Sequence, residues 1–250
     1  MKRWGLVWTL VRTDFKARYH GAVSGFVWAL LKPLAMFVVL MSVFSIFFAQ
    51  EPAYELNLII GLFLWDFFAE GTKTGLTSLA AKAYLLSKAR FPSWILVVTS
   101  ISNALITLTA FSIIILVFLI VAGRPPSIGA FALYLCYCVG LAAVVIGFSL
   151  ATSVLFLRYR DLNQVWDVMV QAGFFVAPIV YPLGIIPERY HLYLYLWPPT
   201  AYIEFSRSVL VAGAVPSLRG HLYLVMASAA CLLVGAIVYR RLGPRAAEYL

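Results

Sequence analysis

Three charged residues recur inside an otherwise apolar stretch, and their spacing could support ion chemistry. Asp66, Glu70 and Lys73 are separated by four and then three positions, which places them on one face of a helix. Ionisable side chains inside membrane helices can form an ion or proton path, as in carriers that power themselves. The reading that we favour is local pairing that neutralises buried charge. Glu204 and Arg207, three positions apart, repeat the pattern.

A serine and two histidines suggest a second chemistry, that of an intramembrane serine protease. Ser149 follows Gly147 in a Gly-x-Ser sequence, and His191 and His221 come later in the chain. Such a protease needs its serine and histidine within hydrogen-bond reach, about 3 Å. A helix that enters the membrane at Ser127 places Ser149 about 33 Å deeper, whereas His221 begins the last apolar run at the outer end. The sequence therefore argues against a Ser149–His221 pair.

Nucleotide hydrolysis and metal binding lack candidate residues in the sequence. The phosphate-binding pattern G-x-x-x-x-G-K-[ST] does not occur, and GTKTG at 71–75 lacks its Gly-Lys pair. Cys136 and Cys138 are two positions apart, so on a helix they face different sides, and Cys231 stands alone. We therefore expect no catalytic residue, no metal site and no bound cofactor in this chain. A transporter built from it would be driven by another polypeptide.

The elements that hold these residues are membrane helices. Of the 250 residues, 63% are hydrophobic and 12% are charged, against roughly 25% charged in an ordinary soluble domain. A helix needs about 20 residues to cross a bilayer. We predict an all-α membrane protein with six transmembrane helices, four from strongly apolar runs and two from weaker ones. The strong runs are 26–49, 94–122, 127–157 and 222–239, and the weaker ones are 56–80 and 168–187.

The distribution of lysine and arginine predicts the orientation. With the N-terminus inside the cell, thirteen of these residues lie in cytoplasmic segments and four in outer ones, in keeping with the excess of positive charge in cytoplasmic loops. Both termini are then cytoplasmic, in a multi-pass protein of the inner (cytoplasmic) membrane. The asymmetry and attraction to anionic lipids account for most of the net charge of +9. Nucleic acid is not implied.

We treat residues 1–250 as a single transmembrane domain with three special segments. Residues 1–25 form a cytoplasmic interface helix, because one face of 4–19 is apolar and the opposite face carries cations. Residues 81–93 are a short cytoplasmic segment of aliphatic, basic and aromatic side chains. Residues 183–221 begin and end outside but are largely apolar, so we expect short re-entrant helices there, broken at Pro198-Pro199.

Aromatic residues make up 16% of the chain. They form a stripe that includes Phe37 and Phe44 on the first span, and Trp166, Phe174 and Tyr181 lie on neighbouring turns of the fifth. Such stripes usually pack against other helices or lipid. The sharper hypothesis is that some line a conduit, because an aromatic ring can stack on the C–H face of a sugar without binding it tightly.

Six stretches, in order, support a family resemblance. They are RTDFKARYHGAVSGFVWALLKPL, IIGLFLWDFF, LLSKARFP, LRYRDLNQVWD, FFVAPIVYPLGIIPERY and AYIEFSRSVL. The chain resembles the membrane (permease) subunit of bacterial ABC exporters of polysaccharides, which export O-antigen, teichoic acid and related lipid-linked glycans. The resemblance implies a homodimer with a channel between its copies and two copies of a separate ATPase subunit that binds ATP and Mg²⁺. The implied substrate is a glycan carried on a polyprenyl diphosphate.

The resemblance also implies roles for individual residues. The helix that couples to the ATPase matches Tyr84, Leu85, Leu86, Lys88, Arg90 and Phe91. The entrance for the anionic headgroup matches Arg12, Lys16, Arg18 and Tyr19. Aromatics of the glycan path match Trp28, Phe37, Phe44, Trp65, Phe174, Phe175 and Tyr181. The outer gate matches Pro178, Pro182, Pro187 and Trp197.

The sequence departs from the family pattern at the gate. Trp197-Pro198-Pro199 stands where Asn-Pro is common, and Ala177 replaces a frequent Ser or Thr, which leaves the detailed gate contacts open. Two other functions also stay open. A permease for small drugs or antibiotics would favour a closed apolar pocket, and a membrane enzyme of glycan assembly would act without any ATPase.

Overall fold

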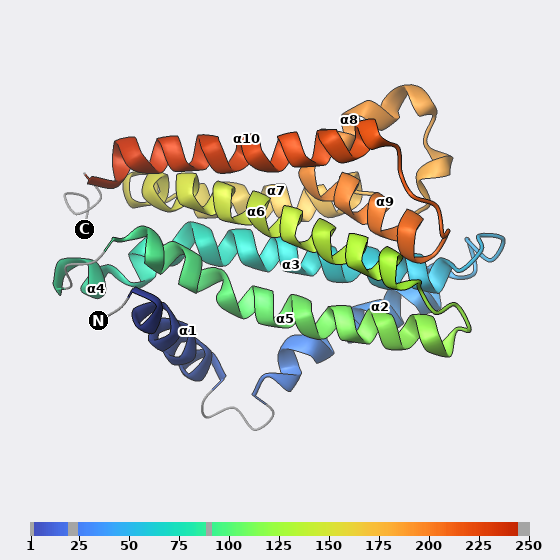
Figure 1. The fold of residues 1–250 in the computed structure, drawn as a ribbon, viewed down its shortest axis with the longest axis horizontal. Coiled ribbons are helices and arrows are strands. Elements are labelled where there is room, and N and C mark those ends of the chain that lie inside the picture. Colours follow the sequence, from blue (N-terminus) through green and yellow to red (C-terminus); the bar gives the residue numbers. More distant parts are fainter. Residues whose placement is uncertain (1–2, 20–24, 89–91, 245–250) are drawn as a thin grey trace.

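The computed structural model describes residues 3–19, 25–88 and 92–244, and these ranges form a bundle of helices without strands (Figure 1). The helices are α1 (Arg3–Tyr19), α2 (Val27–Phe44), α3 (Tyr54–Ala81), α4 (Ala83–Lys88), α5 (Trp94–Val121), α6 (Ile128–Arg158), α7 (Leu162–Val176), α8 (His191–Tyr195), α9 (Pro198–Leu210) and α10 (Leu218–Leu242). Two 3₁₀ turns, η1 (Leu183–Ile185) and η2 (Glu188–Tyr190), precede α8. The predicted all-α class is confirmed.

Four of the described helices are long and apolar enough to cross a membrane: α2, α5, α6 and α10. They correspond to the four strong apolar runs of the sequence. The two weaker runs form helices of a different kind. Helix α3 has 28 residues and carries Asp66, Glu70 and Lys73, whereas α7 has only 15 residues.

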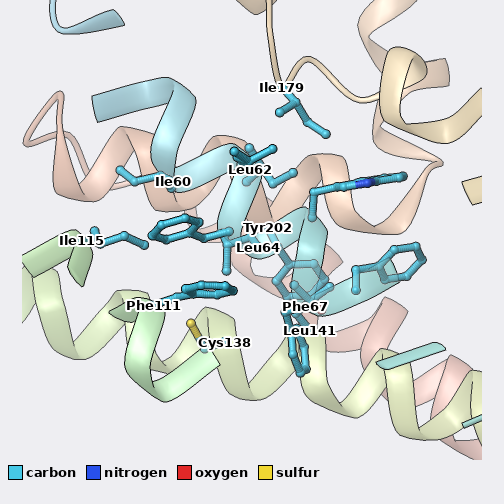
Figure 2. Close-up of a cluster of buried hydrophobic side chains, with 14 of the residues drawn as sticks. Ile60, Leu62, Leu64, Phe67, Phe111, Ile115, Cys138, Leu141, Ile179 and Tyr202 are labelled. Carbon is cyan, nitrogen blue, oxygen red and sulfur yellow. The ribbon is translucent and has the colours of Figure 1, made fainter. Parts of the chain in front are cut away.

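Helix α3 is the centre of the bundle. It packs against α5 and α6, and α10 packs on the far side of α6 (Figure 1). Of its 28 residues, 18 are buried, so protein rather than lipid surrounds most of the helix. This placement explains how a helix with several charges can lie among apolar ones. Figure 2 shows Phe111 of α5, Leu141 of α6 and Tyr202 of α9 gathered around α3.

Glycines let the central helices approach closely. A Cβ atom added to Gly75 of α3 would lie 1.9 Å from Oγ of Ser149 on α6. One added to Gly235 of α10 would lie 2.0 Å from the carbonyl oxygen of Gly147 on α6. Because lipid provides no hydrophobic drive for helix pairing, small residues that permit close packing hold membrane bundles together. These contacts fix α3, α6 and α10 as one unit.

The predicted fifth run, 168–187, is wrong as a single helix. Helix α7 begins at Leu162, ends at Val176 and is followed by non-helical backbone at 177–182. The cause is Pro178, which lacks an N–H donor and disfavours helix in the residue before it. Helix α9 begins at Pro198, where the missing N–H would be unpaired in any case. The predicted break at Pro198-Pro199 is therefore confirmed.

Candidate functional site

A buried arginine on α9 holds the non-helical segment that follows α7. Arg207 is 7% exposed. It donates from Nη1 to the carbonyl oxygen of Pro178 at 2.5 Å and from Nη2 to that of Ile179 at 2.9 Å. Its Nε donates to the carbonyl oxygen of Asn57 on α3 at 2.8 Å. The guanidinium therefore joins α3, α9 and residues 177–182.

Two tyrosine hydroxyls hold the same segment, one by donating into it and one by donating from it to the end of α7. Tyr54 of α3 donates its hydroxyl to the carbonyl oxygen of Val180 at 2.7 Å, and Tyr181 donates to that of Phe175 at 2.9 Å. A Cβ at Gly61 would lie 2.5 Å from Nη2 of Arg207, so glycine leaves room for the guanidinium. Backbone carbonyls at membrane depth need donors, because lipid offers none. Here side chains supply them.

Opposite charges pair differently along α3 and α9. Glu204 and Arg207 form the predicted local ion pair at 2.7 Å. The prediction of pairing along α3 is wrong, because the partners come from other helices. Glu70 pairs with Arg18 of α1, and Lys73 pairs with Asp167 of α7 at 2.8 Å. Asp66 forms no ion pair or hydrogen bond with any described residue.

Helix α1 docks on the bundle through charge and packing. Asp14 pairs with Lys82, which follows α3, and both side chains are largely shielded, at 20% and 13% exposure. Leu10 packs against the apolar cluster around Leu79 and Leu96. Desolvation alone would lower the pKa of Arg18, but its hydrogen bond and attraction to Glu70 outweigh it and leave the pKa raised. These contacts secure α1 to α3 and α5.

The four residues predicted at the headgroup entrance lie in two different environments, because the docking of α1 turns two of them toward the bundle. Arg12 and Lys16 are exposed. Arg18 instead turns to Glu70, and the ring of Tyr19 packs edge-on against Phe26 at 5.4 Å. Of the three predicted entrance cations, Arg12 and Lys16 therefore stay exposed without an ion pair to any described residue, and Arg18 does not.

The predicted coupling residues lie on or beside the six-residue helix α4. Tyr84 is 64% exposed, and Leu85 packs against the cluster that contains Leu79 and Val97. Leu86 and Lys88 belong to α4, but their side chains are not described. Arg90 and Phe91 lie outside the described residues. In Figure 1, α4, the start of α1 and the end of α10 share one end of the bundle.

The aromatics predicted to line a path fall into two groups. Phe37 and Trp65 are buried, and Phe37 packs edge-on against Phe118 of α5 at 5.9 Å. Phe44 stacks on Phe48 at 6.4 Å. In this conformation Phe37 and Phe44 pack within the core of one chain, whereas Trp65 also lines an apolar groove between α2 and α3. Trp28 and Phe175, by contrast, are 61% and 73% exposed, and Phe174 and Tyr181 are half-buried.

A cluster of tryptophans and phenylalanines positions α7. Trp197, from the turn before α9, lies 6.4 Å from Trp65 and 6.3 Å from Trp166 between ring centroids. Gly173 makes this possible, since a Cβ there would lie 2.5 Å from the Trp197 ring. Trp166 also donates to Oγ1 of Thr72 at 3.0 Å. Sequence reasoning missed the role of Gly173, because glycine has no periodic signal of its own.

The predicted gate prolines differ in their surroundings. Pro178 is buried beneath Arg207, Pro182 is half-buried and Pro187 is exposed. Trp197 is half-buried within the aromatic cluster. The gate residues thus run from the core of the bundle to its surface.

The serine protease geometry is excluded. Nε2 of His221 is 2.8 Å from the hydroxyl of Tyr137, and Nδ1 is 3.0 Å from the carbonyl oxygen of Ser217. Ser149 lies twelve residues after Tyr137 on α6, about 18 Å along the axis. His191 contacts the carbonyl oxygen of Ile186 at 2.8 Å. No described histidine can activate Ser149.

Several helices present apolar side chains that no described part of the chain covers, and α7 and α2 are among them. On α7, Val165, Val168 and Phe175 are 56%, 59% and 73% exposed. On α2, Val38 and Val39 are 63% and 56% exposed. Faces of this kind pack against lipid or against another chain.

The sequence pattern of this bundle matches a known family over most of its length. The ABC-2 type transporter family matches residues 5–211. The chain belongs to this family. As a member it is a membrane component of a transporter rather than an enzyme.

Relatives named as O-antigen export permeases or as a polysialic acid transport protein match most of this chain. An O-antigen export system permease protein RfbA from Klebsiella pneumoniae is 27% identical over 246 residues, which cover 98% of this chain and 95% of the relative. The RfbA protein of Myxococcus xanthus is 28% identical, covering 74% of this chain and 71% of the relative. Polysialic acid transport protein KpsM from Escherichia coli is 25% identical, covering 91% and 89%.

Proposed function

We propose that this chain is the transmembrane subunit of an ATP-driven exporter of lipid-linked polysaccharide in the inner membrane. The observation that carries the proposal is the match over 98% of the chain to a relative named as an O-antigen export permease. Similarity that spans all the helices supports a shared transport path. The substrate would be a glycan on a polyprenyl diphosphate, of the O-antigen or teichoic acid type.

In the proposed arrangement the chain crosses the membrane six times with both termini in the cytoplasm. Helices α3 and α7 would be the second and fifth crossings. The burial of α3 by its neighbours supports this assignment, because protein rather than lipid would surround its charges. Residues 183–221 would form the outer gate region, with backbone carbonyls of the adjoining segment satisfied by Arg207.

Two copies would enclose the passage. The uncovered apolar faces of α2 and α7 support a partner at these surfaces. The exposed rings of Trp28 and Phe175 would then lie where a sliding glycan could stack on them. The exposed Arg12 and Lys16 would attract the diphosphate as it approaches from the inner leaflet.

Force would reach the passage through α4. Two copies of an ATPase subunit, which would bind ATP and Mg²⁺, would dock at the end of the bundle that carries α4 and α1. Leu85 packs on the cluster that also receives Leu10, so displacement of α4 would be passed to α3, α5 and α1 together. Truncation of Leu86 and Phe91 should uncouple transport from hydrolysis and leave assembly intact.

The test is export by a reconstituted complex. Vesicles that contain the chain and its co-expressed ATPase should move a lipid-linked glycan in an ATP-dependent manner, and the Leu86→Ala/Phe91→Ala variant should hydrolyse ATP without moving it. Unchanged export by that variant would refute the coupling role. Extrusion of small drugs without glycan movement would favour drug efflux, and glycosyl transfer by the chain alone would make it an enzyme.

A further inference from the structure

A polar cavity lies where α1, α2, α3 and α5 meet. Its volume is about 110 Å³, and its polar lining comes from Arg18, Lys32, Asp66, Glu70, Asn103 and Thr107. Two positive and two negative side chains face it, so their formal charges cancel. Arg18 and Glu70 are already paired with each other. The charges left to act on a ligand are the ammonium of Lys32 and the carboxylate of Asp66.

Two acceptors at this cavity have no donor among the described residues. Asn103 is 5% exposed, and its Oδ1 has no hydrogen-bond partner. The Asp66 carboxylate also receives no hydrogen bond. A buried acceptor left unsatisfied, such as Asn103 Oδ1, is costly, and the half-buried Asp66 carboxylate adds a charged acceptor beside it, so the site is suited to a ligand that brings several N–H groups.

An apolar groove continues from the cavity. It has a volume of about 390 Å³ and shares Lys32, Pro33 and Asp66 with the polar cavity. From there it runs along Met36 and Val39 of α2, with Trp65 and Phe174 on its other side. Val39 is seven residues beyond Lys32, about 10 Å further along the helix. A polar chamber that opens into an apolar groove matches a lipid with a small headgroup.

We propose that this cavity and groove bind a phospholipid whose headgroup carries a primary ammonium, of the phosphatidylethanolamine type. The ammonium donates to Asp66 and to Oδ1 of Asn103, the phosphate accepts from Lys32, and an acyl chain lies in the groove beside Met36. The balanced charges favour a zwitterion over an anionic lipid. A choline headgroup is disfavoured, since its quaternary nitrogen has no N–H to donate.

The site would bind this lipid as a structural component. Its headgroup would join α1 to α2 and α5, and its acyl chain would fill the seam between α2 and α7. Because the site is built from one chain's own helices, the inference does not depend on which cargo is exported. It shares Arg18 and Tyr19 with the predicted headgroup entrance, whereas Arg12 and Lys16 lie outside the cavity.

The test is lipid retention by the full chain co-purified with its ATPase. The complex is placed in nanodiscs with equal amounts of phosphatidylethanolamine, phosphatidylcholine and phosphatidylglycerol, extracted into detergent and examined by native mass spectrometry. We expect about tenfold more ethanolamine lipid than either competitor, as the loss of a charged hydrogen bond would cost the others. Equal retention of all three, or a preference for phosphatidylglycerol, would overturn the proposal.

Variants locate the binding to this cavity. Asp66→Asn and Asn103→Leu should each reduce the excess of ethanolamine lipid several-fold, whereas Glu55→Gln, on the exposed face of the same α3, should not. Lys32 is exposed, so the Lys32→Gln variant should fold normally. If the Asp66→Asn and Asn103→Leu variants fail to assemble, lipid retention by Lys32→Gln tests the proposal instead. A full excess of ethanolamine lipid in Lys32→Gln would contradict the assignment.

Discussion

The Arg207 guanidinium lies 2.9 Å from the carbonyl oxygen of Ile179, measured from Nη2. These residues are distant in the sequence, one on α9 and the other in the backbone that Pro178 keeps from being helical. The sequence predicts that Arg207 lies in an outer segment, but in the structure its guanidinium is a buried hydrogen-bond donor. It satisfies backbone carbonyls that would otherwise face an apolar environment.

Replacing Arg207 by methionine should destabilise the protein strongly. The change removes the donor to Asn57, Pro178 and Ile179 and leaves Glu204 without its partner. Breaking one side of a buried, hydrogen-bonded charge pair costs about 3–5 kcal/mol. The measurement is thermal unfolding of the purified chain in detergent, followed by tryptophan fluorescence.

The matched control is Arg219→Met, at an exposed position near the start of α10. A surface change of this kind should alter the free energy of unfolding by less than about 0.5 kcal/mol. Equal melting temperatures for the two variants would show that the hydrogen bonds of Arg207 contribute nothing to stability.

Adding one methyl group at Gly235 should loosen α10 from α6. The new Cβ would lie 2.0 Å from the carbonyl oxygen of Gly147, and backbone cannot move aside as a side chain can. Overpacking of this kind typically costs about 1–3 kcal/mol, visible as a lower melting temperature for Gly235→Ala. Gly129→Ala is the control, because nothing lies within 4 Å of its Cβ. That change should be neutral or stabilising, and a larger loss there than at Gly235 would contradict the packing argument.

Removing both charge contacts of α1 should free this helix from the bundle. Asp14→Asn with Glu70→Gln eliminates the pairs to Lys82 and Arg18 while keeping the side-chain shapes. If the shielded Asp14–Lys82 pair contributes about 1.5 kcal/mol and the more exposed Arg18–Glu70 pair up to about 1 kcal/mol, amides of α1 should exchange hydrogen more than tenfold faster. Hydrogen exchange read by mass spectrometry measures this, with α10 as an internal reference. Unchanged hydrogen exchange in α1 would mean that the apolar contacts of Leu10 are enough to hold α1 on the bundle.

Apolar composition was enough to predict the strong spans. The runs 94–122 and 127–157 match α5 and α6 to within a residue at each end, because a charge-free run of this length has no competing structure in a membrane. The end of α7 could not be placed as well. Apolarity continues beyond Val176, but the local effect of Pro178 stops the helix.

The partners of the charged residues depended on tertiary structure. Spacing along α3 suggested pairing within the helix, yet Glu70 and Lys73 meet Arg18 and Asp167 from other helices. Helical spacing identifies neighbours on one helix only, and it cannot say which other helices pack nearby. The sequence does contain a signal for Asn103, because it is a polar amide within the charge-free run 94–122. That signal could have identified it as a candidate site residue.

Cross-linking tests whether the uncovered face of α7 meets a second copy. In a chain whose three cysteines are replaced by alanine, Val168→Cys should yield a covalent dimer with a short bifunctional thiol reagent, because residues beside a twofold axis meet their own counterparts. Val225→Cys, equally exposed at 65% but on α10, should remain monomeric, since in the proposed dimer it faces lipid. Denaturing gel electrophoresis distinguishes the two. Linkage through Val225 and none through Val168 would place the interface on α10 rather than on α7 and remove the proposed passage between the α7 helices.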